Sequence, residues 1–157
     1  MTDQPEHEAG ANSAPPFPVG RVAFSLGFAG LLPQVGAAVL AWLGDYDGAL
    51  VAIAYGALIL SFLGGMWWGL AMFRRLGQSL LVTLAVVPSL VAGAILALAA
   101  VHLPTGMVAM GSAIMLTLPV DRWLVTRGAV PANWMRLRVP LSLGLGALTI
   151  AAGALAA

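Results

Sequence analysis

Five long apolar runs follow one another along the chain, separated by short segments rich in polar residues, glycine and proline. The runs lie near residues 24–43, 49–72, 79–101, 105–126 and 134–155. A helix of about 20 residues crosses the roughly 30 Å of hydrocarbon in a bilayer, and each run reaches that length. The runs are continuous and do not alternate between apolar and polar positions, which excludes a transmembrane β-barrel. The pattern predicts an all-α membrane protein, a five-transmembrane-helix bundle.

The composition points the same way. The chain has 157 residues, of which 61% are hydrophobic and 8% charged, and its mean hydropathy is +0.96. A soluble domain carries roughly 25% charged residues, which cover its surface. This chain has too few charges for that, so the composition excludes a soluble enzyme and a nucleic-acid-binding domain. The absence of cysteine excludes a disulfide-stabilised fold. The expected partner is therefore the lipid bilayer and not nucleic acid.

The first 20 residues differ from the rest of the chain. They are polar, with four prolines, three acidic residues and no lysine or arginine. A signal peptide or a transit peptide would carry basic residues here. We predict a disordered cytosolic tail over residues 1–20 and a membrane domain over residues 21–157.

The basic residues gather on one side of the predicted bundle. Five crossings place the N-terminal tail and the loops after the second and fourth apolar runs on the same side. All the basic residues lie there or at its edge: Arg21, Arg74, Arg75, Arg122, Arg127, Arg136 and Arg138. The other side holds Asp45, Asp47 and His102. Because basic residues accumulate in cytoplasmic loops, we predict the N-terminus in the cytosol and the C-terminus outside.

Local signals predict where the helices end. Gly44 and Gly128 suit helix termini, and Gly77 suits the break between the second and third runs. Asp47 is the expected N-cap of the second helix, and Pro104 fits the first turn of the fourth.

Candidate chemistry within the spans is sparse. No ionisable residue lies in the middle of any predicted span, which argues against a proton-coupled transporter. His102 with Met107 and Met110 is a weak ligand set, and methionines at this spacing usually pack. No Ser/His, Asp/Asp or His/Glu constellation lies within the bilayer. We therefore predict no catalytic residue, no metal site and no cofactor, and do not expect an enzyme.

The second run carries small residues at a regular interval. The small-residue stripe consists of Ala57, Ser61, Gly65 and Gly69, which lie four positions apart on one helix face. Such stripes let two helix backbones approach closely in lipid. We predict helix packing along this stripe, with a partner helix either in the same chain or in another copy.

Two further polar features stand out. Gln34, next to Pro33, is the most polar residue deep in a span, and we expect it to face the interior as a candidate polar path. Asp121 lies at the inner end of the fourth run, where Arg136 and Arg138 of the fifth are its expected ion-pair partners.

Residues 21–31 are similar to residues 138–148, with six of eleven positions identical. A parallel internal repeat would explain the similarity, and so would the shared composition of two helices rich in leucine and glycine. The sequence leaves both explanations open.

The segments AYGALILSFLGGMWWGLA (54–71) and WMRLRVPLSL (134–143) resemble the domain-of-unknown-function 3429 proteins, the transmembrane-protein-69-like family. The resemblance covers most of the chain from Phe24 onward. It implies a small multi-pass protein of the bacterial inner membrane, with relatives in mitochondria, and supplies no activity. The motif positions it singles out are Tyr55, Gly56, Ser61, Gly64, Gly65, Trp68, Gly69, Arg136 and Arg138.

These observations favour a non-catalytic membrane protein that acts as a packing or assembly partner, in contact with another membrane protein or with copies of itself. The alternative is a passive transporter or channel for a small neutral solute, which the prolines and Gln34 would line. An odd number of helices without a clear repeat fits common transporter designs poorly.

Overall fold

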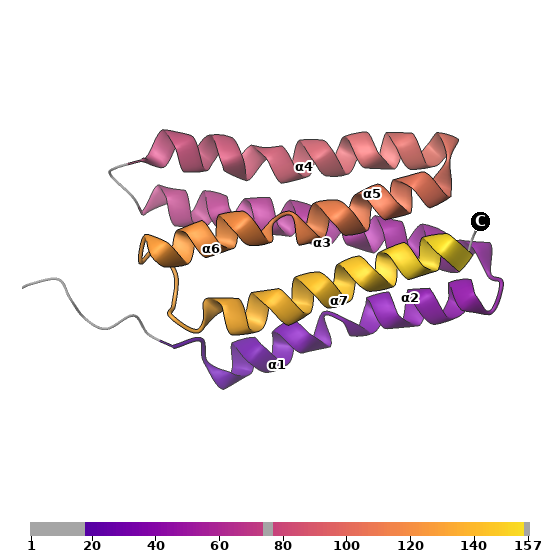
Figure 1. Cartoon of the computed structure of the whole chain (residues 1–157), viewed down its shortest axis with the longest axis horizontal. Coiled ribbons are helices and arrows are strands. Elements are labelled where there is room, and N and C mark those ends of the chain that lie inside the picture. Colours follow the sequence, from indigo (N-terminus) through magenta and orange to yellow (C-terminus); the bar gives the residue numbers. More distant parts are fainter. Residues whose placement is uncertain (1–17, 74–76, 156–157) are drawn as a thin grey trace, which may run out of the picture.

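The computed structural model describes residues 18–73 and 77–155, and within them the regular structure is entirely helical (Figure 1). Most of the predicted N-terminal tail, residues 1–17, lies outside the described residues. The helices are α1 (Arg21–Ala29), α2 (Leu32–Trp42), α3 (Tyr46–Met72), α4 (Gln78–Val101), α5 (Leu103–Met115), α6 (Leu118–Thr126) and α7 (Trp134–Leu155).

These helices form five membrane-length spans. The helices α1 and α2 together form one span, Arg21–Trp42, and α5 and α6 form another, Leu103–Thr126. The helices α3, α4 and α7 each span by themselves. All five are long and apolar enough to cross a bilayer, which confirms the prediction of an all-α protein with five candidate membrane spans.

Two prolines divide the composite spans. Pro33 lies in the first turn of α2 and Pro119 in the first turn of α6, each directly after a break. A proline lacks the backbone N–H and clashes with the preceding turn, so a helix readily restarts at it. Pro88 and Pro140 instead lie inside α4 and α7, which continue through them.

The turns follow the glycine signals. Gly44, Gly77 and Gly128 adopt φ angles of 83°, 71° and 61°, a left-handed conformation that favours glycine. The cap predicted at Asp47 is wrong by two residues. The Oδ1 of Asp45 accepts a hydrogen bond from the Asp47 backbone N–H at 2.9 Å, which makes Asp45 the N-cap of α3.

The helix α3 lies at the centre of the packing and contacts α2, α4, α5 and α7. Small residues allow close approach at two crossings. A Cβ atom on Gly64 would overlap the carbonyl oxygen of Ala85 in α4, and Gly111 of α5 faces Gly146 of α7 in the same way. In contrast, α1 has no buried residue, and its main contact in the described part of the chain is with α7.

Two clusters of apolar side chains form the core. One surrounds Met107, Met110 and Ile114, and the other surrounds Trp67 and Leu124 nearer the end where α1 and α7 begin. We call that end the arginine end, because Arg21, Arg122, Arg127 and Arg136 lie there.

Candidate functional site

A buried polar network joins three spans near the arginine end. Asp121 of α6 is completely buried, and Arg138 of α7 is 6% exposed. The Nε of Arg138 donates to Oδ2 of Asp121 at 2.6 Å. The Nε1 of Trp67 in α3 donates to the other carboxylate oxygen at 3.1 Å. Nη2 of Arg138 also donates to the Thr117 hydroxyl at 3.2 Å.

Local structure explains these positions. Thr117 immediately precedes α6 and its hydroxyl donates to the Ile114 carbonyl at 2.7 Å. Asp121 follows in the first turn of α6, where the helix dipole stabilises a negative charge. Both carboxylate oxygens of Asp121 accept hydrogen bonds, one from Trp67 and one from Arg138, so the network links α3, α6 and α7. Of the two arginines expected beside Asp121, the structure pairs Arg138 and leaves Arg136 exposed.

A second polar contact joins the first turn of α2 to α7. Nε2 of Gln34 donates to the Thr149 hydroxyl at 2.7 Å, and that hydroxyl donates to the Leu145 carbonyl at 2.8 Å. Gln34 and Thr149 are both completely buried. Oε1 of Gln34 and the hydroxyl of Ser142 are buried and have no hydrogen-bond partner in the described part of the chain. Gln34 thus faces the bundle interior, as expected, but it lies in a packed helix interface.

The small-residue stripe of α3 lies along the edge of this packing. Ala57 is buried and Ser61 half-buried, whereas Gly65 and Gly69 are exposed. A Cβ atom at Gly65 or Gly69 would meet no atom of another helix within 4 Å. The close intramolecular approaches of α3 instead occur at Gly56, which faces Met110, and at Gly64. A helix that packs on Gly65 and Gly69 would therefore have to come from another molecule or from residues that the structure does not describe.

A shallow groove between α3 and α4 continues the stripe, with a volume of about 420 Å³. Ser61 from α3 and Ser89 and Gly93 from α4 line it, and the other lining residues are Ala54, Ala57, Leu58, Ala92 and Leu96. The hydroxyls of Ser61 and Ser89 have no hydrogen-bond partner among the described residues. The sequence indicated the α3 side of this groove but not its α4 side.

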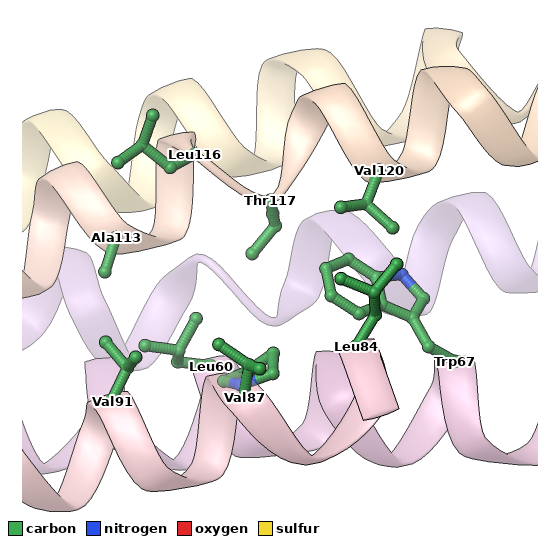
Figure 2. A pocket seen from close by; sticks show the side chains of 10 residues that line it. Leu60, Trp67, Leu84, Val87, Val91, Ala113, Leu116, Thr117 and Val120 are labelled. Atoms are coloured by element: carbon green, nitrogen blue, oxygen red, sulfur yellow. The ribbon is translucent and has the colours of Figure 1, made fainter. Parts of the chain in front are cut away.

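An apolar cavity of about 260 Å³ opens between α4 and the α5–α6 span. Figure 2 shows Thr117 and Val120 on one side and Leu84 and Val91 of α4 on the other, with the Trp67 indole near one end. The helix α4 packs on α3 and α5 but makes little contact with α6, which leaves this space open. The sequence carried no signal for the cavity, because it depends on the divergence of two helices.

Three further residues that the sequence singled out lie away from these features. The Tyr55 hydroxyl donates to the Gly30 carbonyl at 2.6 Å, which ties α3 to the break between α1 and α2. Trp68 is exposed on the outer face of α3. His102 caps α5, since its Nδ1 accepts from the Thr105 backbone N–H at 3.2 Å.

The described residues contain no group of three or more His, Cys, Asp or Glu side chains that would hold a metal ion. The buried polar groups of the network and of the Gln34–Thr149 contact mainly bond one another across helix interfaces. Their arrangement supports helix packing, and it presents no nucleophile beside a base.

Comparison with known proteins identifies the family. The model for a protein of unknown function, DUF3429, matches residues 19–154 and so covers most of the chain. The chain belongs to this family, as the resemblance of its motifs indicated. No curated protein and no solved structure matches it.

Proposed function

We propose that this member of the DUF3429 family is a non-catalytic membrane protein that acts as an assembly partner. In this proposal, a transmembrane helix of another membrane protein lies in the groove between α3 and α4. The observation that carries it is the groove itself, where small residues from two neighbouring helices leave their backbones accessible from outside the bundle.

The physical argument rests on packing in lipid. Apolar side chains gain little by leaving lipid for protein, so helices associate where small residues permit close backbone contact and interhelical hydrogen bonds. Ser61 and Ser89 offer two hydroxyls beside Gly93 that have no partner among the residues the structure describes. A helix in the groove would contact both backbones and satisfy these hydroxyls.

A crosslinking experiment tests the proposal. A photoreactive amino acid replaces Ser89 in cells, and the captured protein is identified by mass spectrometry. The two groove variants are Gly93→Leu, which fills the groove itself, and Gly65→Leu, which lies four residues beyond Ser61 on the stripe that the groove continues. Gly36→Leu is the matched control on α2. A Cβ at any of these glycines meets no other helix, so all three variants should fold.

We expect one partner membrane protein, with its capture reduced about tenfold or more by both groove variants and unchanged by the control, as for a loss of about 1.4 kcal/mol in binding. Capture of a second copy of this chain instead would replace the assembly role with homo-oligomerisation. Equal capture by the groove variants and the wild type would contradict the proposal.

A passive path for a small neutral solute is the alternative function. Gln34, its most polar candidate residue, is buried against Thr149 rather than lining an opening. Gln34→Leu separates the two functions. Unchanged partner capture and no change of solute flux in proteoliposomes would support the assembly role, whereas a specific loss of flux would support the path.

We also propose that the chain lies in the inner membrane of a bacterium, with the arginine end and the N-terminus in the cytosol. The distribution of arginines supports this orientation through the preference of basic residues for the cytoplasmic side. A phosphatase reporter fused after Ala157 should be active outside the cytosol. If only a reporter that works in the cytosol were active at that position, the C-terminus would lie in the cytosol and the proposed orientation would be wrong.

A further inference from the structure

The starts of α1 and α7 are neighbours at the arginine end (Figure 1). Residues from both starts line a polar pocket. Its volume is about 690 Å³, and its lining residues are Val19, Arg21, Phe24, Ser25, Asn133 and Arg136. None of these residues lines the groove between α3 and α4 or the cavity beside α4. The pocket is therefore separate from the surface proposed for the partner helix.

Within residues 18–73 and 77–155, no carboxylate balances the charges of the two arginines of the pocket. Arg21 and Arg136 are both exposed. The carboxylates of the described residues are Asp45 and Asp47 at the opposite end and Asp121, whose oxygens bond Arg138 and Trp67. Two guanidinium groups in one pocket without a carboxylate partner among the described residues favour an anionic ligand.

The pocket also has a defined wall. The Val19 backbone N–H donates to Oδ1 of Asn133 at 2.7 Å, which joins the segment before α1 to the segment before α7. Ser25 adds a hydroxyl to the lining. The N-cap of α1, Gly20, provides no side-chain cap, so the first N–H groups of that helix have no side-chain partner among the described residues and can bond an anion.

An apolar surface begins at the same place. Phe24 lines the pocket, and its ring stacks on Phe28 one turn farther along α1 at a centroid distance of 6.4 Å. Arg21 and Arg136 lie within the first three residues of their spans, at the depth where lipid headgroups meet the hydrocarbon. The pocket thus combines cationic groups at headgroup depth with an aromatic surface that leads into the bilayer.

From this geometry we propose that the pocket binds the headgroup phosphate of an anionic phospholipid. The guanidinium groups of Arg21 and Arg136 hold the phosphate oxygens, and an acyl chain lies along Phe24 and Phe28. Basic pockets between membrane helices recognise anionic headgroups in this way. The inference is independent of the assembly role, because it uses different residues and a different ligand.

The test is a lipid titration of the purified full chain by native mass spectrometry. Phosphatidylglycerol, phosphatidylcholine and inorganic phosphate are the probes. Arg21→Gln/Arg136→Gln removes the charges of the pocket, and Arg122→Gln/Arg127→Gln is the matched control, since both its arginines are exposed at the same end. Arg21→Lys/Arg136→Lys keeps the charge and shows whether the site survives substitution.

We expect the wild type to retain one phosphatidylglycerol in preference to phosphatidylcholine. The Gln pair should weaken this binding about 25-fold, the product of roughly fivefold for each basic residue near an anionic headgroup. The control pair should bind as the wild type does, and the Lys pair should fall between them.

Three results would overturn the proposal. Equal retention of both phospholipids would show that binding does not depend on the net negative charge of the headgroup. Equal loss in the Gln pair and in the control pair would show attraction to the whole arginine end rather than to the pocket. Tight binding of inorganic phosphate that excludes phosphatidylglycerol would identify a site for a free anion instead of a lipid.

Discussion

The buried Asp121–Arg138 ion pair predicts a large loss of stability when its negative charge is removed. Asn has nearly the same shape as Asp, so Asp121→Asn removes the charge without opening a cavity. Arg138, which is 6% exposed, would then keep its charge with only neutral partners, the new amide and the Thr117 hydroxyl. The Trp67 indole N–H would compete for the same amide oxygen.

The magnitude follows from the burial of both groups. Removing one partner of a buried ion pair destabilises a protein by about 3–5 kcal/mol, because the other charge is left uncompensated. The contact between Arg138 and Asp121 is 2.6 Å long, and Asp121 is completely buried. We therefore expect Asp121→Asn to lower the free energy of unfolding by about 3–5 kcal/mol, a change of roughly 150- to 5,000-fold in the unfolding equilibrium.

Reversible unfolding in mixed micelles, followed by tryptophan fluorescence, measures this free energy. Arg122→Gln is the matched control, since Arg122 is exposed and the variant should remain within about 0.5 kcal/mol of the wild type. The double variant Asp121→Leu/Arg138→Met removes both charges. It should recover most of the stability that the single variant loses, because no buried charge remains unpaired.

Two results would refute this reasoning. A loss below about 1 kcal/mol for Asp121→Asn would mean that water or lipid headgroups reach Arg138, since only a desolvated charge carries the larger penalty. A double variant as unstable as the single variant would mean that shape at this site, and not charge, holds α6 and α7 together.

The same unfolding assay checks two smaller predictions. Gly64→Ala should destabilise by about 1–3 kcal/mol, because its Cβ would overlap a backbone carbonyl oxygen of α4, whereas Gly65→Ala should have little effect. Similar losses of stability in the two variants would mean that Gly64 does not lie on the packed face of α3. Tyr55→Phe removes the hydrogen bond to Gly30 and should lower the free energy of unfolding by about 1 kcal/mol. Tyr46→Phe, at an exposed position, should leave that free energy unchanged. A neutral Tyr55→Phe would mean that this bond adds nothing to stability.

The spans were predictable because the bilayer imposes a length on them. Runs near 49–72, 79–101 and 134–155 became α3, α4 and α7 with shifts of at most three residues at their ends. The turn glycines were predictable for a similar reason, since φ angles near +60° to +80° favour a residue without a Cβ. The breaks within two spans followed from proline, although the sequence did not show which prolines would divide a helix and which would be tolerated.

The candidate site was predictable only in part. The sequence placed Asp121 near Arg136 and Arg138, and the structure selected Arg138, whose side chain turns inward while Arg136 stays exposed. It indicated that Gln34 would face inward, but not that Thr149 would be its partner. The Gln34–Thr149 pair joins residues 115 positions apart, so it depends on which spans become neighbours.

Which face of each helix packs against its neighbours is decided by the tertiary structure, for a physical reason. In a soluble helix, the apolar face identifies the core. In α3, apolar residues surround the helix, because lipid and protein interior are both apolar, and hydrophobic periodicity then carries little information about direction. The sequence by itself determined that the chain has five helical runs long and apolar enough to span a membrane, and that small residues recur along α3. Only the tertiary structure decided that Gly56 and Gly64 face neighbouring helices while Gly65 and Gly69 face outward.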